Sequence, residues 1–148
     1  MMNHVACATE HKASDQLNAI FPEVDLLTTS GYFKAVSHGV SGTNLKDIIR
    51  VISDRDIFAR VIGKDKSNLS KSYRLVKLPT VIGDNVIDTV RVYMQASDVY
   101  GSLELAKEWL STPIPALGGE VPLDIMDTPA GRELVRQTLR KIEYGEYS

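Results

Sequence analysis

The spacing of apolar residues in the second half of the chain is the feature that most constrains its fold. From Asp84 to Gly101 apolar side chains recur every three or four residues. They are Val86, Ile87, Val90, Tyr93, Met94 and Val99. This period places them on one face of an α-helix. The segment is therefore predicted to be the central helix of an all-α protein.

A group of shorter helices is predicted before this segment. Leu45, Ile48, Ile49 and Ile52 share one helical face, with Thr43 or Asn44 as the N-cap. Ser53 is the expected cap of a second helix, which carries Ile57, Phe58, Val61 and Ile62. A turn at Gly63 and a third helix over residues 67–76 would complete a helix-turn-helix unit.

Basic residues are concentrated in that same part of the chain. Residues 46–77 hold nine basic and four acidic residues, whereas the remainder holds eight basic and fifteen acidic ones, giving −2 overall. A basic block in an acidic protein favours an anionic partner, with DNA the first candidate, although a solvated helical surface is the alternative. The predicted DNA-binding residues are Lys64, Lys66, Ser67, Asn68, Ser70, Lys71 and Arg74.

The C-terminal third shows capped helices around a rigid loop. Ser102 is predicted to cap a helix whose Leu105, Ala106, Trp109 and Leu110 pack inward. The prolines and glycines of residues 113–122 predict a shaped loop, and Thr128–Pro129 predicts the start of the last helix, which Gly145 ends.

Several classes of protein are disfavoured by the composition. The 148 residues contain one cysteine, Cys7, and no apolar run long enough for a membrane span, so a cytoplasmic protein without disulfides or membrane attachment is expected. His4, Cys7 and His11 lack a fourth ligand nearby, so no metal site is predicted. We expect no catalytic residues and no cofactor, since no nucleophile motif or phosphate-binding loop is present.

One run of residues carries a resemblance to a known family. It comprises Ala106–Leu110, Pro113, Ala116–Gly119, Pro122–Asp124, Asp127–Thr128, Gly131, Val135, Leu139 and Ile142–Gly145. The run closely resembles the Xre/MbcA/ParS toxin-binding domain of antitoxins. The resemblance implies a toxin-binding domain over residues 84–148 and an Xre-like helix-turn-helix region over residues 45–83. Residues 1–44 have no counterpart and are predicted to be partly flexible. Residues 1–25 are weakly patterned and are predicted to be a tail.

The resemblance also implies a function. Such a protein is the antitoxin of a type II toxin-antitoxin system, which neutralises a RES-domain, NAD-consuming toxin by occluding its active site with the C-terminal region. It also represses its own operon through operator DNA, and two-fold operator binding favours a homodimer. The toxin-binding residues would be Arg136, Arg140, Lys141, Tyr144, Gly145 and Tyr147. The alternative is a transcription regulator without a toxin partner, whose C-terminal domain serves dimerisation.

Overall fold

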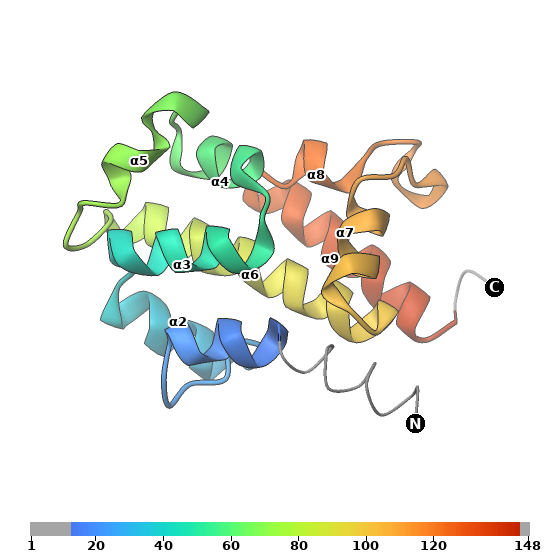
Figure 1. Ribbon diagram of the computed structural model, residues 1–148. Coiled ribbons are helices and arrows are strands. Elements are labelled where there is room, and N and C mark those ends of the chain that lie inside the picture. The colour runs from blue at the N-terminus through green and yellow to red at the C-terminus, as the bar shows by residue number, and fades with distance from the viewer. Residues whose placement is uncertain (1–12, 146–148) are drawn as a thin grey trace, which may run out of the picture. The chain divides into compact units, whose positions relative to one another are not determined.

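The computed structural model describes residues 13–145, and every regular element in that range is helical (Figure 1). Residues 13–20 are helical, and the elements after them are α2 (Thr29–His38), α3 (Gly42–Ile52), α4 (Arg55–Ile62), the 3-10 helix η1 (Lys66–Asn68), α5 (Leu69–Ser72), α6 (Thr80–Tyr100), α7 (Leu103–Leu110), the 3-10 helix η2 (Pro115–Leu117), α8 (Pro122–Ile125) and α9 (Pro129–Glu143). The predicted all-α class is confirmed.

The chain divides into two compact units, and the boundary falls within α6. One unit consists of Asp15–Arg91, and the other contains the residues from Val92 onward. The predicted central helix is present, but it begins at Thr80, one turn before the predicted Asp84.

The first unit has a core built on the predicted apolar face of α3. Leu45, Ile48 and Ile52 are buried, as are the apolar residues of α4. The cap of α3 lies earlier than predicted, at Ser41, whose hydroxyl accepts from the backbone N–H of Asn44 at 3.0 Å. The Asn44 side chain returns a bond to the Ser41 N–H, which completes a capping box.

The prediction of an unstructured tail over residues 1–25 is wrong for the part that the structure describes. Residues 13–20 are helical, and Leu17 and Phe21 are buried. The apolar pattern there is weak, so local spacing did not indicate a helix. Burial of these few side chains stabilises the segment instead.

A polar cluster holds the segment around α2 against α6 within the first unit. The Arg91 Nε donates to the Leu26 carbonyl at 2.7 Å, its guanidinium lies 4.2 Å from the Tyr32 ring centre, and Nη1 pairs with Asp88 at 3.1 Å. The Tyr32 hydroxyl donates to Asp84. Burial, this hydrogen bond and the nearby carboxylates raise the pKa of Tyr32.

The third predicted helix is shorter than expected. Residues 67–76 were predicted to be helical, but η1 and the single turn of α5 end at Ser72. The chain then leaves the helix because it bonds to a distant segment. The Gly42 N–H donates to the Leu75 carbonyl at 2.8 Å, and the Leu78 N–H donates to the Val40 carbonyl at 2.8 Å.

The helix boundary at Ser53 also differs from the prediction. Ser53 was expected to cap α4, but it lies at the end of α3 with φ 63°, and Asp54 precedes α4 without a side-chain capping bond. The reversed role follows from backbone geometry, because a left-handed residue ends a helix rather than starting one.

The second unit follows the predicted caps closely. Ser102 accepts from the Leu105 N–H at 3.1 Å, and Thr128 accepts from the Gly131 N–H at 3.0 Å. The predicted loop is held by a bond from the Ile114 N–H to the Glu120 carbonyl at 3.0 Å. The prediction that Leu105 packs inward is wrong. Leu105 points outward and is 50% exposed, because the α7 face turned inward carries Ala106 and Leu110.

The start of α9 depends on glycine at position 131. A Cβ there would overlap the carbonyl oxygen of Ile125, the last residue of α8. Backbone therefore packs on backbone at this point, in a way that no other residue permits.

This contact predicts that Gly131→Ala destabilises the protein by at least about 2 kcal/mol, the range of a steric core defect. Alanine ordinarily stabilises a helix relative to glycine, so a decrease in the free energy of unfolding would itself indicate the steric overlap. Urea unfolding followed by circular dichroism measures the change. Gln137→Ala, at an exposed position of the same helix, is the control and should shift stability by less than about 0.5 kcal/mol. Equal midpoints for the two variants would contradict the close contact.

Candidate partner-binding surfaces

Helix α9 separates a buried face from an exposed one. Arg132, Val135, Thr138 and Leu139 are buried, and Leu134, Gln137, Arg140, Lys141 and Tyr144 are exposed. The Arg132 Nη1 donates to the Met126 carbonyl at 3.0 Å, which anchors the first turn. Gln95 of α6 donates to the Arg136 carbonyl at 3.4 Å. The exposed face is thus presented on a helix whose position is fixed from two directions.

Glu133 holds two of the predicted toxin-binding arginines. Its Oε2 lies 2.8 Å from Arg136 Nη1, and its Oε1 lies 3.1 Å from Arg140 Nη2. The hydrogen bond from Arg136 lowers the pKa of the Glu133 carboxyl, partial burial opposes this shift, and the bond from Arg140 adds to it. The Arg136 side chain is only 14% exposed, whereas that of Arg140 is 47% exposed. We name this group, Glu133 with Arg136 and Arg140, the α9 arginine clamp.

The other predicted toxin-binding residues lie at the end of α9. Lys141 is exposed on the last turn, Tyr144 is 75% exposed, and Gly145 follows in the left-handed conformation with φ 73°. Tyr144 follows Lys141 by three residues, so the two side chains lie on the same helical face. Tyr147 lies outside the described residues.

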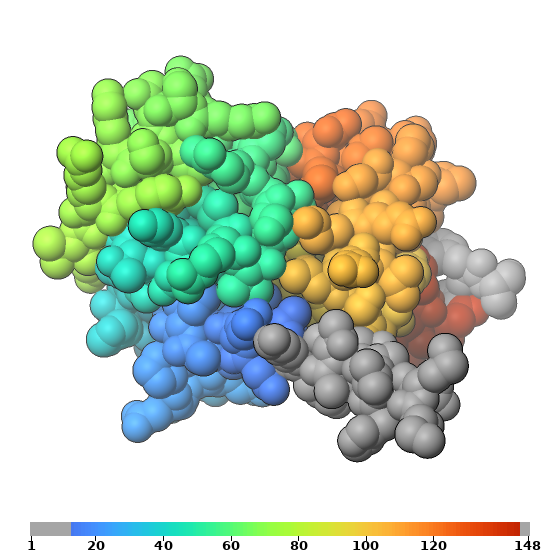
Figure 2. All heavy atoms as spheres, in the orientation of Figure 1, coloured from blue at the N-terminus to red at the C-terminus, as the bar shows by residue number. Residues whose placement is uncertain are grey.

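The predicted DNA-binding residues lie in a short segment of the first unit. Lys64 precedes η1, Lys66, Ser67 and Asn68 form η1, Ser70 and Lys71 lie in α5, and Arg74 follows it. All are exposed except Asn68, which is half-buried. Figure 2 shows the green segment that contains α5 at the surface of its unit. The seven positions therefore share one surface segment, although it is a broken helix rather than a continuous one.

The cations of this segment differ in how far they are neutralised. Lys66 Nζ lies 3.7 Å from Asp56, which also contacts Arg60 Nε at 3.4 Å. Lys64, Lys71 and Arg74 have no ion-pair partner among residues 13–145. Their positive charge is the least compensated, and they are the best placed to contact an anion.

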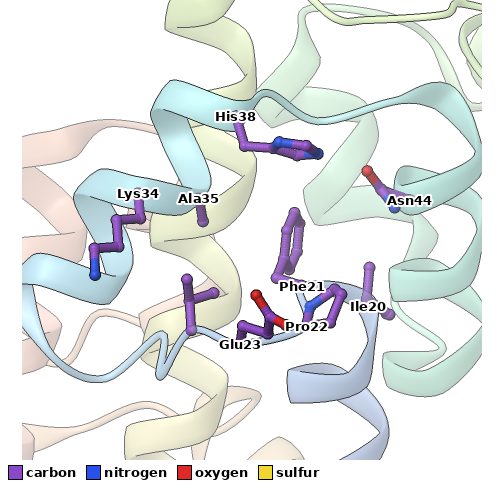
Figure 3. Close-up of a pocket in the computed structure, with 9 residues that line it drawn as sticks. Ile20, Phe21, Pro22, Glu23, Lys34, Ala35, His38 and Asn44 are labelled. Carbon is purple, nitrogen blue, oxygen red and sulfur yellow. The ribbon is translucent and has the colours of Figure 1, made fainter.

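A recess of about 520 Å³ lies within the first unit, between α2, the turn at residues 21–24 and α3. Figure 3 shows the His38 ring near the Phe21 ring and the Asn44 side chain directed toward the same space, while Lys34 extends away from it. Glu23 lies in the lining with φ 69°, an uncommon conformation for a residue other than glycine. The sequence did not indicate this recess, because residues 1–25 were interpreted as a tail.

A smaller recess of about 270 Å³ lies in the second unit. Its lining consists of Tyr100, Leu105, Glu108, Trp109 and Thr112. The sequence interpretation placed Trp109 in the core, but the side chain is only half-buried and stacks on Tyr100. The helical spacing of Trp109 with Leu105 and Leu110 did not indicate that one side of the Trp109 ring reaches the surface.

The described residues contain no arrangement suited to metal binding. Among residues 13–145 no three His, Cys, Asp or Glu side chains gather as a metal site. His4, Cys7 and His11 lie outside the described residues. Within the described range no helix is long and apolar enough to cross a membrane.

Comparison with known proteins finds a family match within the second unit and relatives whose similarity covers two thirds or more of the chain. Residues 95–145 match the family described as the antitoxin Xre/MbcA/ParS C-terminal toxin-binding domain. Over 124 residues the chain is 25% identical to the Prs ADP-ribosylating antitoxin of Sphingobium sp. strain YBL2, covering 76% of this chain and 78% of that protein. Over 102 residues it is 30% identical to Antitoxin Xre of Photorhabdus laumondii subsp. laumondii strain TT01, covering 67% of this chain and 62% of that protein. The aligned region thus spans less than two thirds of the Photorhabdus protein.

The α9 arginine clamp predicts a graded change in the Glu133 pKa. Because Arg136 makes the shorter bond, Arg136→Ala should raise the carboxyl pKa more than Arg140→Ala does. Titration of the Glu133 side-chain carbon by NMR measures both shifts. The stabilisation from this lowered pKa is present while the unfolded-state carboxyl is ionised and is lost as pH falls through the folded-state pKa. An unchanged pKa in both variants would contradict the clamp.

Proposed function

Residues 95–145 match the antitoxin Xre/MbcA/ParS C-terminal toxin-binding domain family, and from this match we propose that the protein is the antitoxin of a type II system with a RES-domain toxin as its partner. The domain itself implies a toxin partner. The name of the Sphingobium relative connects that protein with ADP-ribosylation. Since NAD is the usual donor of ADP-ribose, this name supports a toxin that consumes NAD.

The mechanism that fits the second unit best is occlusion of the toxin's active site by the end of α9. A protein that blocks a pocket needs shape and binding energy rather than reactive groups. Tyr144 is the most exposed large hydrophobic side chain of α9 and its cap, and Arg140 and Lys141 lie one turn before it. Tyrosine and arginine are the residue types that contribute most at protein interfaces. This exposed terminal turn is the single observation that carries the mechanism.

The α9 arginine clamp supports this role by ordering the side chains before binding. A free arginine loses side-chain entropy when it docks, whereas one already held by Glu133 has lost much of that freedom in the unbound protein. Arg136 is the better held of the two, since it is largely buried and makes the shorter bond. We therefore assign Arg140, Lys141, Tyr144, Gly145 and Tyr147 to direct toxin contact and Arg136 mainly to the support of Arg140.

For DNA binding we propose the segment around η1 and α5, with the protein acting as a homodimer that represses its own operon. Lys64, Lys71 and Arg74 supply uncompensated charge, and Lys66 adds to it. The side chains of Ser67, Asn68 and Ser70 offer hydrogen bonds for phosphates or base edges. Because a single such segment reads one half-site, a dimer matches a two-fold operator.

Removal of residues 144–148 should abolish protection from the toxin while the helical content is retained. Tyr144 is largely exposed, so its loss costs little packing. The measurement is NAD loss in a reaction that contains the neighbour-encoded RES toxin, with and without an equimolar amount of each protein. Phe33→Ala, which truncates another strongly exposed aromatic side chain in the first unit, is the control and should protect fully. Full protection by the truncated protein would exclude the tail as the occluding element.

Replacement of Lys71 and Arg74 by alanine should weaken binding to DNA from the protein's own promoter. The slope of log K against log salt should become shallower by about 2, one for each lost phosphate contact. Fluorescence anisotropy over a salt series measures this slope. Lys34→Ala, an exposed cation on α2, should leave it unchanged. The double variant should still protect NAD from the toxin, and a loss of both functions would indicate unfolding instead.

A further inference from the structure

The small recess at the end of α6 is lined by two half-buried aromatic side chains, so part of an aromatic surface remains accessible. Tyr100 ends α6, and Leu105, Glu108 and Trp109 belong to α7. The two rings stack with centroids 5.7 Å apart and planes inclined by 30°. Burial raises the pKa of Tyr100, which agrees with a hydroxyl held partly away from water. The pair is thus rigid, partly desolvated and open on one side.

The charge beside these rings is acidic. Glu108 lines the recess, and Glu104 lies one helical turn before it. Both glutamates are exposed, and neither carboxylate has an ion-pair partner among residues 13–145. Leu105 extends the apolar surface between them and is half exposed. An aromatic wall with an unneutralised carboxylate is complementary to a cation that also has an apolar stem.

The volume of the recess further limits the kind of group that can bind in it. At about 270 Å³ it lies at the lower edge of the range for small-molecule pockets, about 300–1,000 Å³. One long side chain fits such a space better than a whole ligand does. Arginine and lysine place a positive group over an aromatic face and bury their aliphatic stems against apolar surface.

We propose that this recess is a second docking site for the toxin, and that it receives an arginine or lysine side chain of the toxin between the Tyr100–Trp109 pair and Glu108. The proposal rests on the proposed function, since it presumes the toxin partner. It differs from the occlusion by the end of α9, because the recess binds the toxin's surface rather than its active site. Its location within residues 95–145, the segment that matches a toxin-binding domain, supports this assignment.

Trp109 offers a direct readout, because it is the only tryptophan of the chain. The full-length protein is labelled with 5-fluorotryptophan, and its single ¹⁹F resonance is followed as unlabelled neighbour-encoded RES toxin is added. The proposal predicts a shift of this resonance on complex formation. It predicts the same shift with the variant that lacks residues 144–148, since the recess and the tail act separately.

Charge reversal tests the electrostatic part. Glu108→Lys should weaken toxin binding at least tenfold by calorimetry, and Glu108→Gln should weaken it less. Glu120→Lys is the matched control, because Glu120 is also exposed in the second unit but does not line the recess. It should change binding less than twofold. Leu105→Ala should weaken binding in the same direction, whereas Val81→Ala, a comparable truncation of an exposed residue in the first unit, should not.

Three results would overturn the proposal. If the toxin binds the wild-type protein but the Trp109 resonance stays unmoved and Glu108→Lys behaves like Glu120→Lys, the recess is not a docking site, and the occlusion mechanism stands unaffected. If the resonance shifts with protein concentration in the absence of toxin, the recess receives a second copy of this chain. If the wild-type protein does not bind the toxin, the proposed function fails and this inference fails with it.

Discussion

The geometry of the second unit depends on the backbone contact between Gly131 and the Ile125 carbonyl. Because no Cβ intervenes, the first turn of α9 lies directly against the end of α8. Arg132 reinforces the contact with its bond to the Met126 carbonyl. This contact sets the orientation of α9, and therefore the direction of every side chain on its exposed face, through Tyr144. A helix that presents a binding surface needs a fixed start, and here the start is fixed by close approach rather than by a large apolar contact.

The first unit uses the same arrangement at α2. Thr28 caps the helix, its hydroxyl accepts from the Gly31 N–H at 3.0 Å, and a Cβ on Gly31 would overlap the Asp25 carbonyl. In both helices threonine and glycine are three residues apart, so one residue satisfies the free N–H of the other while the glycine permits close packing. Arg91 then fastens the segment before α2 to α6 through the Leu26 carbonyl. Polar contacts of short reach thus position the helices, and apolar burial stabilises them.

Local signals predicted the helices well, but they could not predict what distant bonds impose. Ser102 and Thr128 were identified as caps because a cap depends only on the next three residues. The third helix of the first unit was predicted to be too long. The bond from the Gly42 N–H to the Leu75 carbonyl joins residues far apart in sequence, so local signals could not predict it. For the candidate site, the arginines of α9 were named from residue type and resemblance. The pairing of these arginines with Glu133 was not predicted. Glu133 lies three residues before Arg136 and seven before Arg140, a spacing that places all three on adjacent turns.

That clamp also decides which groups remain for a partner. Arginine has five N–H donors, and the clamp contact of Arg140 engages one Nη with Glu133. In the proposed complex, a carboxylate of the toxin could therefore bind the remaining donors without displacing Glu133. Displacement would be costly for Arg136, since a largely buried guanidinium without its carboxylate loses a charge-assisted bond in a region that water reaches poorly. In the proposed complex, specificity at this surface would therefore be set by the direction of the Arg140 guanidinium, which Glu133 fixes, and not by positive charge alone.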